Sequence, residues 1–308
     1  MNVVRAITLT LISSLLFATM STLVRYVGGS VPVGQVVFFR AFFAIIPVVV
    51  VYAWRNELRD AVRTQRPLGH VGRGLFSVGG MFLNFAALVR LALVEATAIS
   101  FASPFITVAL SAIYLGERVR AYRWSAVFVG FCGVMVMLWP QLNLSMFSGA
   151  HYSAAAIGSL CAVGAAVFNS ASVIQTRRLT DSETTASIVF YFSIICAVAG
   201  LMTLPFGWVW PTQGQWVALI ATGLFGGISH ILLTESYRYG PASLVAPFGY
   251  SVLIWVFLLG YFVFGEVPHL LVFAGAVIVV GAGLFVLFRE RQLGLQRPVD
   301  AESPPGQN

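Results

Sequence analysis

Apolar residues form ten long blocks along the chain, separated by short stretches that contain turn-forming residues. A helix needs about 20 apolar residues, at roughly 1.5 Å of rise each, to cross the hydrocarbon core of a bilayer. The separating stretches carry helix-ending pairs such as Gly28-Gly29 and Gly240-Pro241. The pattern therefore predicts ten membrane-spanning helices, at 6–25, 33–53, 71–91, 95–115, 122–139, 151–173, 184–204, 215–235, 242–264 and 267–288.

The composition supports an integral membrane protein and excludes a soluble one. Hydrophobic residues make up 58% of the 308 residues and charged residues only 9%, against about 25% in a soluble globular protein. So few charges cannot cover the surface of a soluble body of this size. Ten spans leave no room for a separate soluble domain, and the proline-containing segment 291–308 is expected to be a disordered cytoplasmic tail.

All 18 basic residues are arginines, and their positions predict the orientation of the chain, because short cytoplasmic loops are enriched in basic residues. With ten spans, 15 arginines fall on one side, Arg25 and Arg90 on the other, and Arg40 within the second span. The 15 are Arg5, Arg55, Arg59, Arg63, Arg66, Arg73, Arg118, Arg120, Arg123, Arg177, Arg178, Arg238, Arg289, Arg291 and Arg297. Both termini are therefore expected in the cytoplasm, and the net charge of +7 reflects orientation and not a nucleic-acid partner.

Matching landmarks recur in the two halves of the chain. A Gly-Glu turn follows the fourth span at Gly116-Glu117 and the ninth span at Gly265-Glu266. Gly-Gly pairs occur in the third and eighth spans, at 79–80 and 226–227. Because each half has five spans, the second half must enter the membrane from the opposite side. The sequence thus predicts an all-α integral membrane protein with two five-helix inverted repeats, 1–145 and 146–290, which is typical of secondary transporters.

Small and polar residues gather on single faces of several predicted spans. The fourth span has such a face, with a spacing of three or four residues, at Ala96, Ser100, Ser103, Thr107 and Ser111. Close helix packing explains glycine and alanine at this spacing. Amides and imidazoles are costly in lipid unless water or a partner satisfies them, so Asn84, Asn169 and His230 are interpreted as lining a cavity.

Arg40 is the arginine that lies inside a predicted span, roughly 10 Å deep when counted from Val33. Two interpretations are open. The side chain could extend back to the outer interface. Alternatively, it could face a central cavity and hold an acidic or carbonyl group of a substrate, or the backbone of a neighbouring span.

Prolines and glutamates at special positions predict turns and bends. Pro104 and Pro247 lie within the fourth and ninth spans, where a missing N–H and a ring clash kink a helix, as a hinge or as a static bend. Glu117 and Glu266 each follow a glycine at a helix C-terminus, where the helix dipole disfavours a negative charge. They are expected to fix the turn by capping the N-terminus of the next span.

The paired Gly-Glu turns, the second-span Arg40 and the segment 240–247 together resemble the EamA family of the drug/metabolite transporter superfamily. The resemblance runs from about residue 6 to 288. It implies a ten-helix secondary transporter of the bacterial inner membrane. The segments 227–230 and 237–243 are similar to a branch that includes riboflavin importers and S-adenosylmethionine transporters, while other branches export amino acids and related metabolites.

Together these features predict a transporter that works by alternating access, with no cofactor and no metal. Its first-choice substrate is riboflavin or a similar heteroaromatic metabolite, and S-adenosylmethionine and exported amino acids are alternatives. A polytopic membrane enzyme is the alternative from another class, although the four histidines are scattered and no aspartate lies inside a span. The residues expected to contact the substrate are Arg40, Asn84, Ser100, Ser103, Thr107, Asn169, His230 and Tyr250.

Overall fold

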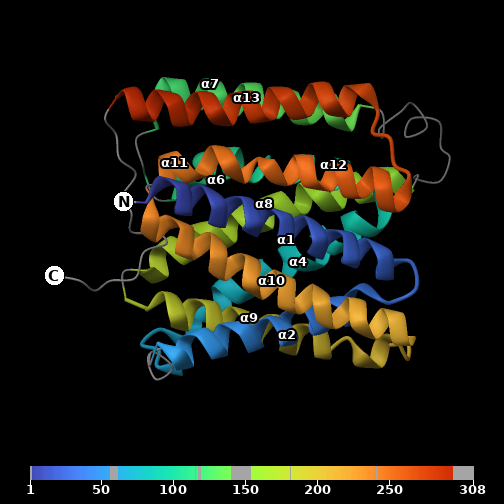
Figure 1. Cartoon of the computed structure of the whole chain (residues 1–308). Coiled ribbons are helices and arrows are strands. Elements are labelled where there is room, and N and C mark those ends of the chain that lie inside the picture. The colour runs from blue at the N-terminus through green and yellow to red at the C-terminus, as the bar shows by residue number, and fades with distance from the viewer. Residues whose placement is uncertain are drawn as a thin grey trace.

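The computed structural model describes residues 2–55, 62–114, 116, 119–139, 154–180, 182–240 and 242–293. All regular elements among these residues are helical (Figure 1). The helices are α1 (Val3–Gly28), α2 (Val33–Trp54), α4 (Pro67–Arg90), α5 (Leu93–Ser100), α6 (Ser103–Tyr114), α7 (Ala121–Leu138), α8 (Ala154–Thr180), α9 (Thr185–Leu201), the 3₁₀ turn η2 (Leu204–Phe206), α10 (Gln213–Tyr239), α11 (Ala242–Gly249), α12 (Ser251–Phe264) and α13 (Leu270–Gln292).

The predicted all-α membrane fold is confirmed. Nine helical stretches in the described residues are long and apolar enough to cross a membrane. Two of them combine neighbouring helices: Leu93–Tyr114 contains α5 and α6, and Val245–Phe264 contains most of α11 and all of α12. The remaining predicted span, the seventh at 184–204, corresponds to α9, which has 17 residues and ends at Leu201 instead of at 204.

The fourth and ninth spans are each broken into two helices, close to the prolines that predict a kink there. A tight turn at Phe101 and Ala102 separates α5 from α6. Tyr250 separates α11 from α12, and its N–H donates to the Pro247 carbonyl at 3.3 Å. Pro104 directly follows the first break and Pro247 precedes the second. Proline explains the weakened helix at both places, and the role of these residues as hinges stays a prediction.

The helices of the two halves interleave, and their packing repeats when the halves are exchanged. Helix α1 packs on α10 and on the broken pair α11 and α12, just as α8 packs on α4 and on the broken pair α5 and α6. Likewise α2 packs on α10, as α9 packs on α4. Helices α2 and α9 are counterparts in the two halves and pack on each other, and so are α7 and α13. These two pairs form opposite edges of the bundle (Figure 1). This symmetry is what an inverted repeat of five helices requires.

The two Gly-Gly pairs permit close helix contacts. A Cβ at Gly80 would collide with the Asn169 side chain of α8. A Cβ at Gly227 would lie 2.9 Å from the Ala44 carbonyl of α2. Helix backbones approach closely where side chains are absent, which is a common way of packing helices in membranes.

Helix α1 begins and α13 finishes at the same end of the bundle, here called the terminal end (Figure 1). The Asn2 N–H donates to the Tyr239 carbonyl at 3.2 Å, so the last turn of α10 also lies there. The opposite end is called the far end. An even number of spans requires both termini on one side, and the assignment of that side to the cytoplasm stays a prediction.

Candidate functional site

The two helix breaks meet in the interior through an aromatic pair. Phe101, at the α5/α6 break, and Tyr250, at the α11/α12 break, have ring centroids 4.9 Å apart with an interplanar angle of 31°. The Tyr250 hydroxyl packs against Gly283 of α13, where a Cβ would collide with it. Tyr250, which was expected to contact the substrate, therefore lies where the two inverted halves touch.

A serine pair ties each break to the first helix of the other half. Ser103, at the start of α6, lies with its Oγ 3.0 Å from the Oγ of Ser170 in α8. Ser251, at the start of α12, lies with its Oγ 2.6 Å from the Oγ of Ser14 in α1. Ser103, another expected contact residue, is thus held at a break by a hydrogen bond within the protein.

A seam of polar contacts runs along the antiparallel pair α4 and α8. The residues that form these contacts lie on one face of each helix. Asn84 lies one turn beyond Gly80 on the same face of α4. The contacts are Arg73 with Thr176 at 2.6 Å, Ser77 with Ser172 at 2.6 Å, and Gly80 with the Asn169 side chain. The seam brings together Asn84 and Asn169, both half-buried, and a substrate contact by either stays a prediction.

The other two hydroxyl residues expected at the site bond to their own helical stretch. Ser100 Oγ donates to the Thr97 carbonyl at 2.6 Å, and Thr107 Oγ1 donates to the Ser103 carbonyl at 2.9 Å. These bonds use the hydroxyl hydrogens and leave only oxygen lone pairs for a ligand.

Arg40 lies in the middle of α2 and points into the bundle, not toward the outer interface. It is 5% exposed, and its guanidinium carbon lies 6.0 Å from the centroid of the Phe192 ring in α9. On its other side it approaches α10, where a Cβ at Gly226 would lie 3.3 Å from Arg40 Nε. A cation–π contact contributes about 0.5–2 kcal/mol, which is less than the several kcal/mol that burial of an ion costs.

His230 lies one turn after Gly226 on the same face of α10. Its ring is exposed and meets Phe17 of α1 edge-on, with centroids 4.8 Å apart. His230 is also within electrostatic reach of Arg40 and Arg73. The histidine and Arg40 therefore belong to one region of the bundle, in which Arg40 is buried and His230 is exposed.

Arg73 is a functional candidate that the sequence pattern placed wrongly, among the loop arginines. It lies in the second turn of α4, and its Nη1 donates to the Ile188 carbonyl at 3.0 Å. Its guanidinium carbon lies 5.1 Å from the centroid of the Phe192 ring. The helix begins at Pro67 and not at 71, and proline at the first helical position was the signal that could have indicated this.

Two arginines therefore share one aromatic ring in the interior. We call the group the central arginine cluster, and it consists of Arg40, Arg73, Phe192, His230 and the buried Cys196, which lies one turn after Phe192 in α9. Its residues come from α2 and α4 of the first half and from α9 and α10 of the second. Within the described residues, no carboxylate lies within ion-pair distance of Arg40 or Arg73. The cluster is thus a positively charged region between the two halves.

Glu266 joins the halves at the far end, but it does not cap the next helix in the chain as expected. Its Oε2 accepts from the N–H of Leu93, the first residue of α5, at 2.8 Å. Its Oε1 forms an ion pair with Arg25, which also donates to the Leu88 carbonyl at 2.9 Å. A carboxylate is favourable at a helix N-terminus because of the helix dipole. Glu117, the counterpart of Glu266, lies outside the described residues.

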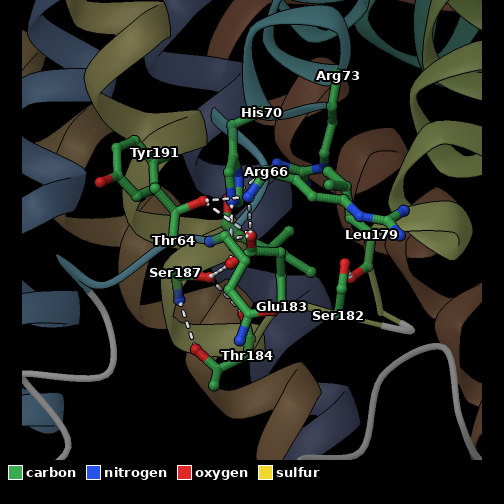
Figure 2. A network of polar contacts seen from close by, with 12 residues as sticks. Thr64, Arg66, His70, Arg73, Leu179, Ser182, Glu183, Thr184, Ser187 and Tyr191 are labelled. Carbon is green, nitrogen blue, oxygen red and sulfur yellow. Dashed lines mark hydrogen bonds and ion pairs between the residues drawn. The ribbon is translucent and has the colours of Figure 1, made fainter. Parts of the chain in front are cut away.

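Glu183 joins the halves at the terminal end (Figure 2). Its Oε1 accepts from Thr64 Oγ1 at 2.8 Å and from the N–H groups of Gln65 and Arg66, both at 2.7 Å. Its Oε2 accepts from Ser187 Oγ at 3.2 Å. These donors precede α4 and begin α9, so one carboxylate fixes the loop of the first half against the second half.

The Glu183 carboxylate is almost fully enclosed. Its side chain and that of His70 are each 2% exposed, and His70 Nε2 lies 3.5 Å from Glu183 Oε2. The Tyr191 ring packs against the His70 ring, with ring centroids 4.7 Å apart (Figure 2). Burial opposes ionisation of Glu183, but the hydrogen bonds from Thr64 and from the Arg66 and Gln65 backbone outweigh it and lower its pKa. The sequence pattern did not single out this residue.

Comparison with known proteins agrees with this architecture. The sequence model of the EamA-like transporter family matches residues 4–139 and 156–288. The S-adenosylmethionine uptake transporter of Rickettsia bellii is 30% identical over 271 residues, which are 87% of this chain and 88% of the relative. The pseudopaline exporter CntI of Pseudomonas aeruginosa is 29% identical over 279 residues, 89% and 93% of the two chains. The riboflavin transporter of Vibrio cholerae is 27% identical over 283 residues, 90% of each chain.

A solved crystal structure has the same fold. Its TM-score is 0.64 at 22% sequence identity, and the match covers 94% of this chain and 97% of the other. The two family matches fall on the two five-helix halves that the packing relates to each other. The chain belongs to the EamA-like transporter family.

Proposed function

We propose that this protein is a secondary transporter that moves a small metabolite by alternating access between its two five-helix halves. The matched breaks in the fourth and ninth spans carry this proposal. Broken helices at corresponding positions of inverted repeats mark the binding site of secondary transporters near the bilayer midplane. Here the breaks meet at Phe101 and Tyr250, and the central arginine cluster lies between the same two halves.

The substrate that fits these surroundings joins a planar ring to an anionic group. The rings of Phe17, Phe192, Phe101 and Tyr250 offer faces and edges for stacking. Arginine is suited to bidentate binding of a carboxylate. S-adenosylmethionine carries both a purine and a carboxylate, and relatives of about 30% identity are named for its uptake.

Riboflavin is the second candidate. It carries a larger planar ring but no carboxylate, and relatives at 27% and 29% identity are named riboflavin transporters. The exposed imidazole ring of His230 and the neighbouring aromatic rings favour riboflavin, while the two arginines match only the carboxylate of S-adenosylmethionine.

Counterflow in proteoliposomes tests the transport function. Vesicles loaded with unlabelled S-adenosylmethionine are expected to accumulate the labelled compound transiently, because a carrier exchanges substrate and a channel does not. Phe101→Ala is expected to reduce the initial rate about tenfold, since it removes the contact between the breaks. Phe131→Ala, on the exposed surface of α7, is the matched control and should transport normally. Absence of counterflow with both S-adenosylmethionine and riboflavin would reject the proposed substrates.

The orientation gives a separate prediction, made on the proposal that this is a bacterial inner-membrane protein with a cytoplasmic terminal end. A green fluorescent protein fused after the last residue is expected to fluoresce in whole bacteria, because it folds in the cytoplasm. Alkaline phosphatase fused at Trp210, between α9 and α10, is expected to be active outside the cytoplasm. The reverse pattern would show that the arginine distribution was misread.

A further inference from the structure

The two arginines of the central arginine cluster lack an anionic partner within the described residues, and a substrate can supply one. Arg40 is 95% buried, since only 5% of its surface is exposed. Its guanidinium contacts the Phe192 ring and, within the described residues, forms no hydrogen bond and no ion pair. A buried guanidinium without an anion is unfavourable, and proteins usually pair it.

Arg73 supplies a second cation on the same ring. Its Nε and Nη1 bind Thr176 and the Ile188 carbonyl, which fixes the orientation of the guanidinium and leaves Nη2 with its hydrogens available. The guanidinium carbons of Arg73 and Arg40 lie 5.1 and 6.0 Å from the Phe192 centroid. Both guanidinium groups therefore border the same aromatic ring.

The acidic side chains that could neutralise the pair are used elsewhere. Glu183, Glu235, Glu266 and Glu290, four of the five glutamates in the described part of the chain, have partners near the two ends of the bundle. Glu95 lies in the first turn of α5, at the far end. Within the described residues, therefore, no acidic side chain supplies the counter-charge, and an anionic group of a bound molecule would supply it.

We propose that Arg40 and Arg73, beside the shared Phe192 ring, bind the carboxylate of the transported metabolite. This inference rests on the proposed function and specifies which chemical group of the substrate the halves hold. Arg40 supplies a fork of donors without a protein partner, and Arg73 supplies its pre-oriented Nη2. Gly226 leaves the space in which the Arg40 side chain lies, since a Cβ there would be 3.3 Å from Nε.

A pair of compounds that differ only in the carboxylate tests the proposal. Binding of S-adenosylmethionine and of decarboxylated S-adenosylmethionine to the purified full chain is measured by calorimetry or by thermal stabilisation. The wild type is expected to bind the carboxylate compound at least about 30-fold more tightly, because an unpaired buried charge is costly. Arg40→Gln and Arg73→Gln are each expected to reduce this preference to less than about threefold. Arg90→Gln, an exposed arginine, should keep it.

A structural role for Arg40 predicts different results. If Arg40 binds the substrate, ligand-free Arg40→Gln protein should melt at the same or a higher temperature than the wild type, because a buried unpaired charge has been removed. A lower melting temperature together with an unchanged carboxylate preference would overturn the proposal. No binding of either compound would also overturn it. Riboflavin counterflow without any carboxylate preference would overturn the inference and leave the transport function intact.

Discussion

Glu183→Ala is expected to lower the thermal unfolding midpoint of the purified protein by about 6–12 °C. The substitution leaves the N–H groups of Gln65 and Arg66 and the hydroxyl of Thr64 without their acceptor in an enclosed place. Loss of a buried carboxylate with several hydrogen bonds costs about 3 kcal/mol, and each kcal/mol is about 2–4 °C for a chain of this size. The measurement is a melting curve in detergent.

Glu235→Ala is the matched control for this prediction. Glu235 pairs with Arg55 and Arg238 at the same end of the molecule, but its side chain and those of its partners are 21–49% exposed. Such a pair contributes about 0–1 kcal/mol, so the midpoint should fall by less than about 4 °C. Equal losses in the two variants would contradict the role assigned to Glu183 as the buried link between the halves.

The pH dependence follows from the same carboxylate. The folded-state pKa of Glu183 is lowered, so its contribution to stability is complete above its unfolded pKa of about 4.3 and disappears as the pH falls through the folded value. The wild type should therefore lose stability below about pH 4 more steeply than Glu183→Gln, which has no carboxylate to protonate. Parallel curves for the two proteins would argue against an ionised Glu183 in the folded state.

The helices and the repeat could be predicted from the sequence because both are recognised from short stretches of residues without three-dimensional information. A span is recognised by the length of an apolar block, and the repeat by Gly-Glu and Gly-Gly landmarks that need no three-dimensional information. The breaks at Phe101 and Tyr250 were not predicted. Prolines 104 and 247 indicate a weakened helix, but the position of the break depends on packing against the other half.

The candidate site was only partly visible in the sequence. Arg40 is prominent because it is a charge inside an apolar block, and the structure places it beside Phe192. Arg73 was assigned to a loop because it lies near a helix start, where apolar length defines the boundary poorly. The partners of Glu183 and Glu266 in the other half are more than 100 residues away in the chain, so neither link between the halves could be derived from a local pattern.

Exchanging the charges of Arg25 and Glu266 is expected not to rescue the protein. Each single substitution, Arg25→Glu or Glu266→Arg, should lower the thermal midpoint by about 4–8 °C, because it leaves a half-buried charge beside an equal charge. In a simple ion pair the double variant would restore most of this loss. Here Glu266 also accepts from the Leu93 N–H, and Arg25 also donates to the Leu88 carbonyl. After exchange, an arginine would face an N–H and a carboxylate would face a carbonyl, both of which are repulsive.

Glu266→Gln separates the two functions of this residue. Glutamine keeps an oxygen that can accept from the Leu93 N–H at the start of α5 but removes the charge that attracts Arg25. The midpoint should therefore fall by about half as much as in Glu266→Ala, which loses both interactions. A double Arg25→Glu/Glu266→Arg variant as stable as the wild type would show that the ion pair alone matters. The capping of α5 by the second half would then have no energetic role, and the far end would be held by charge attraction only.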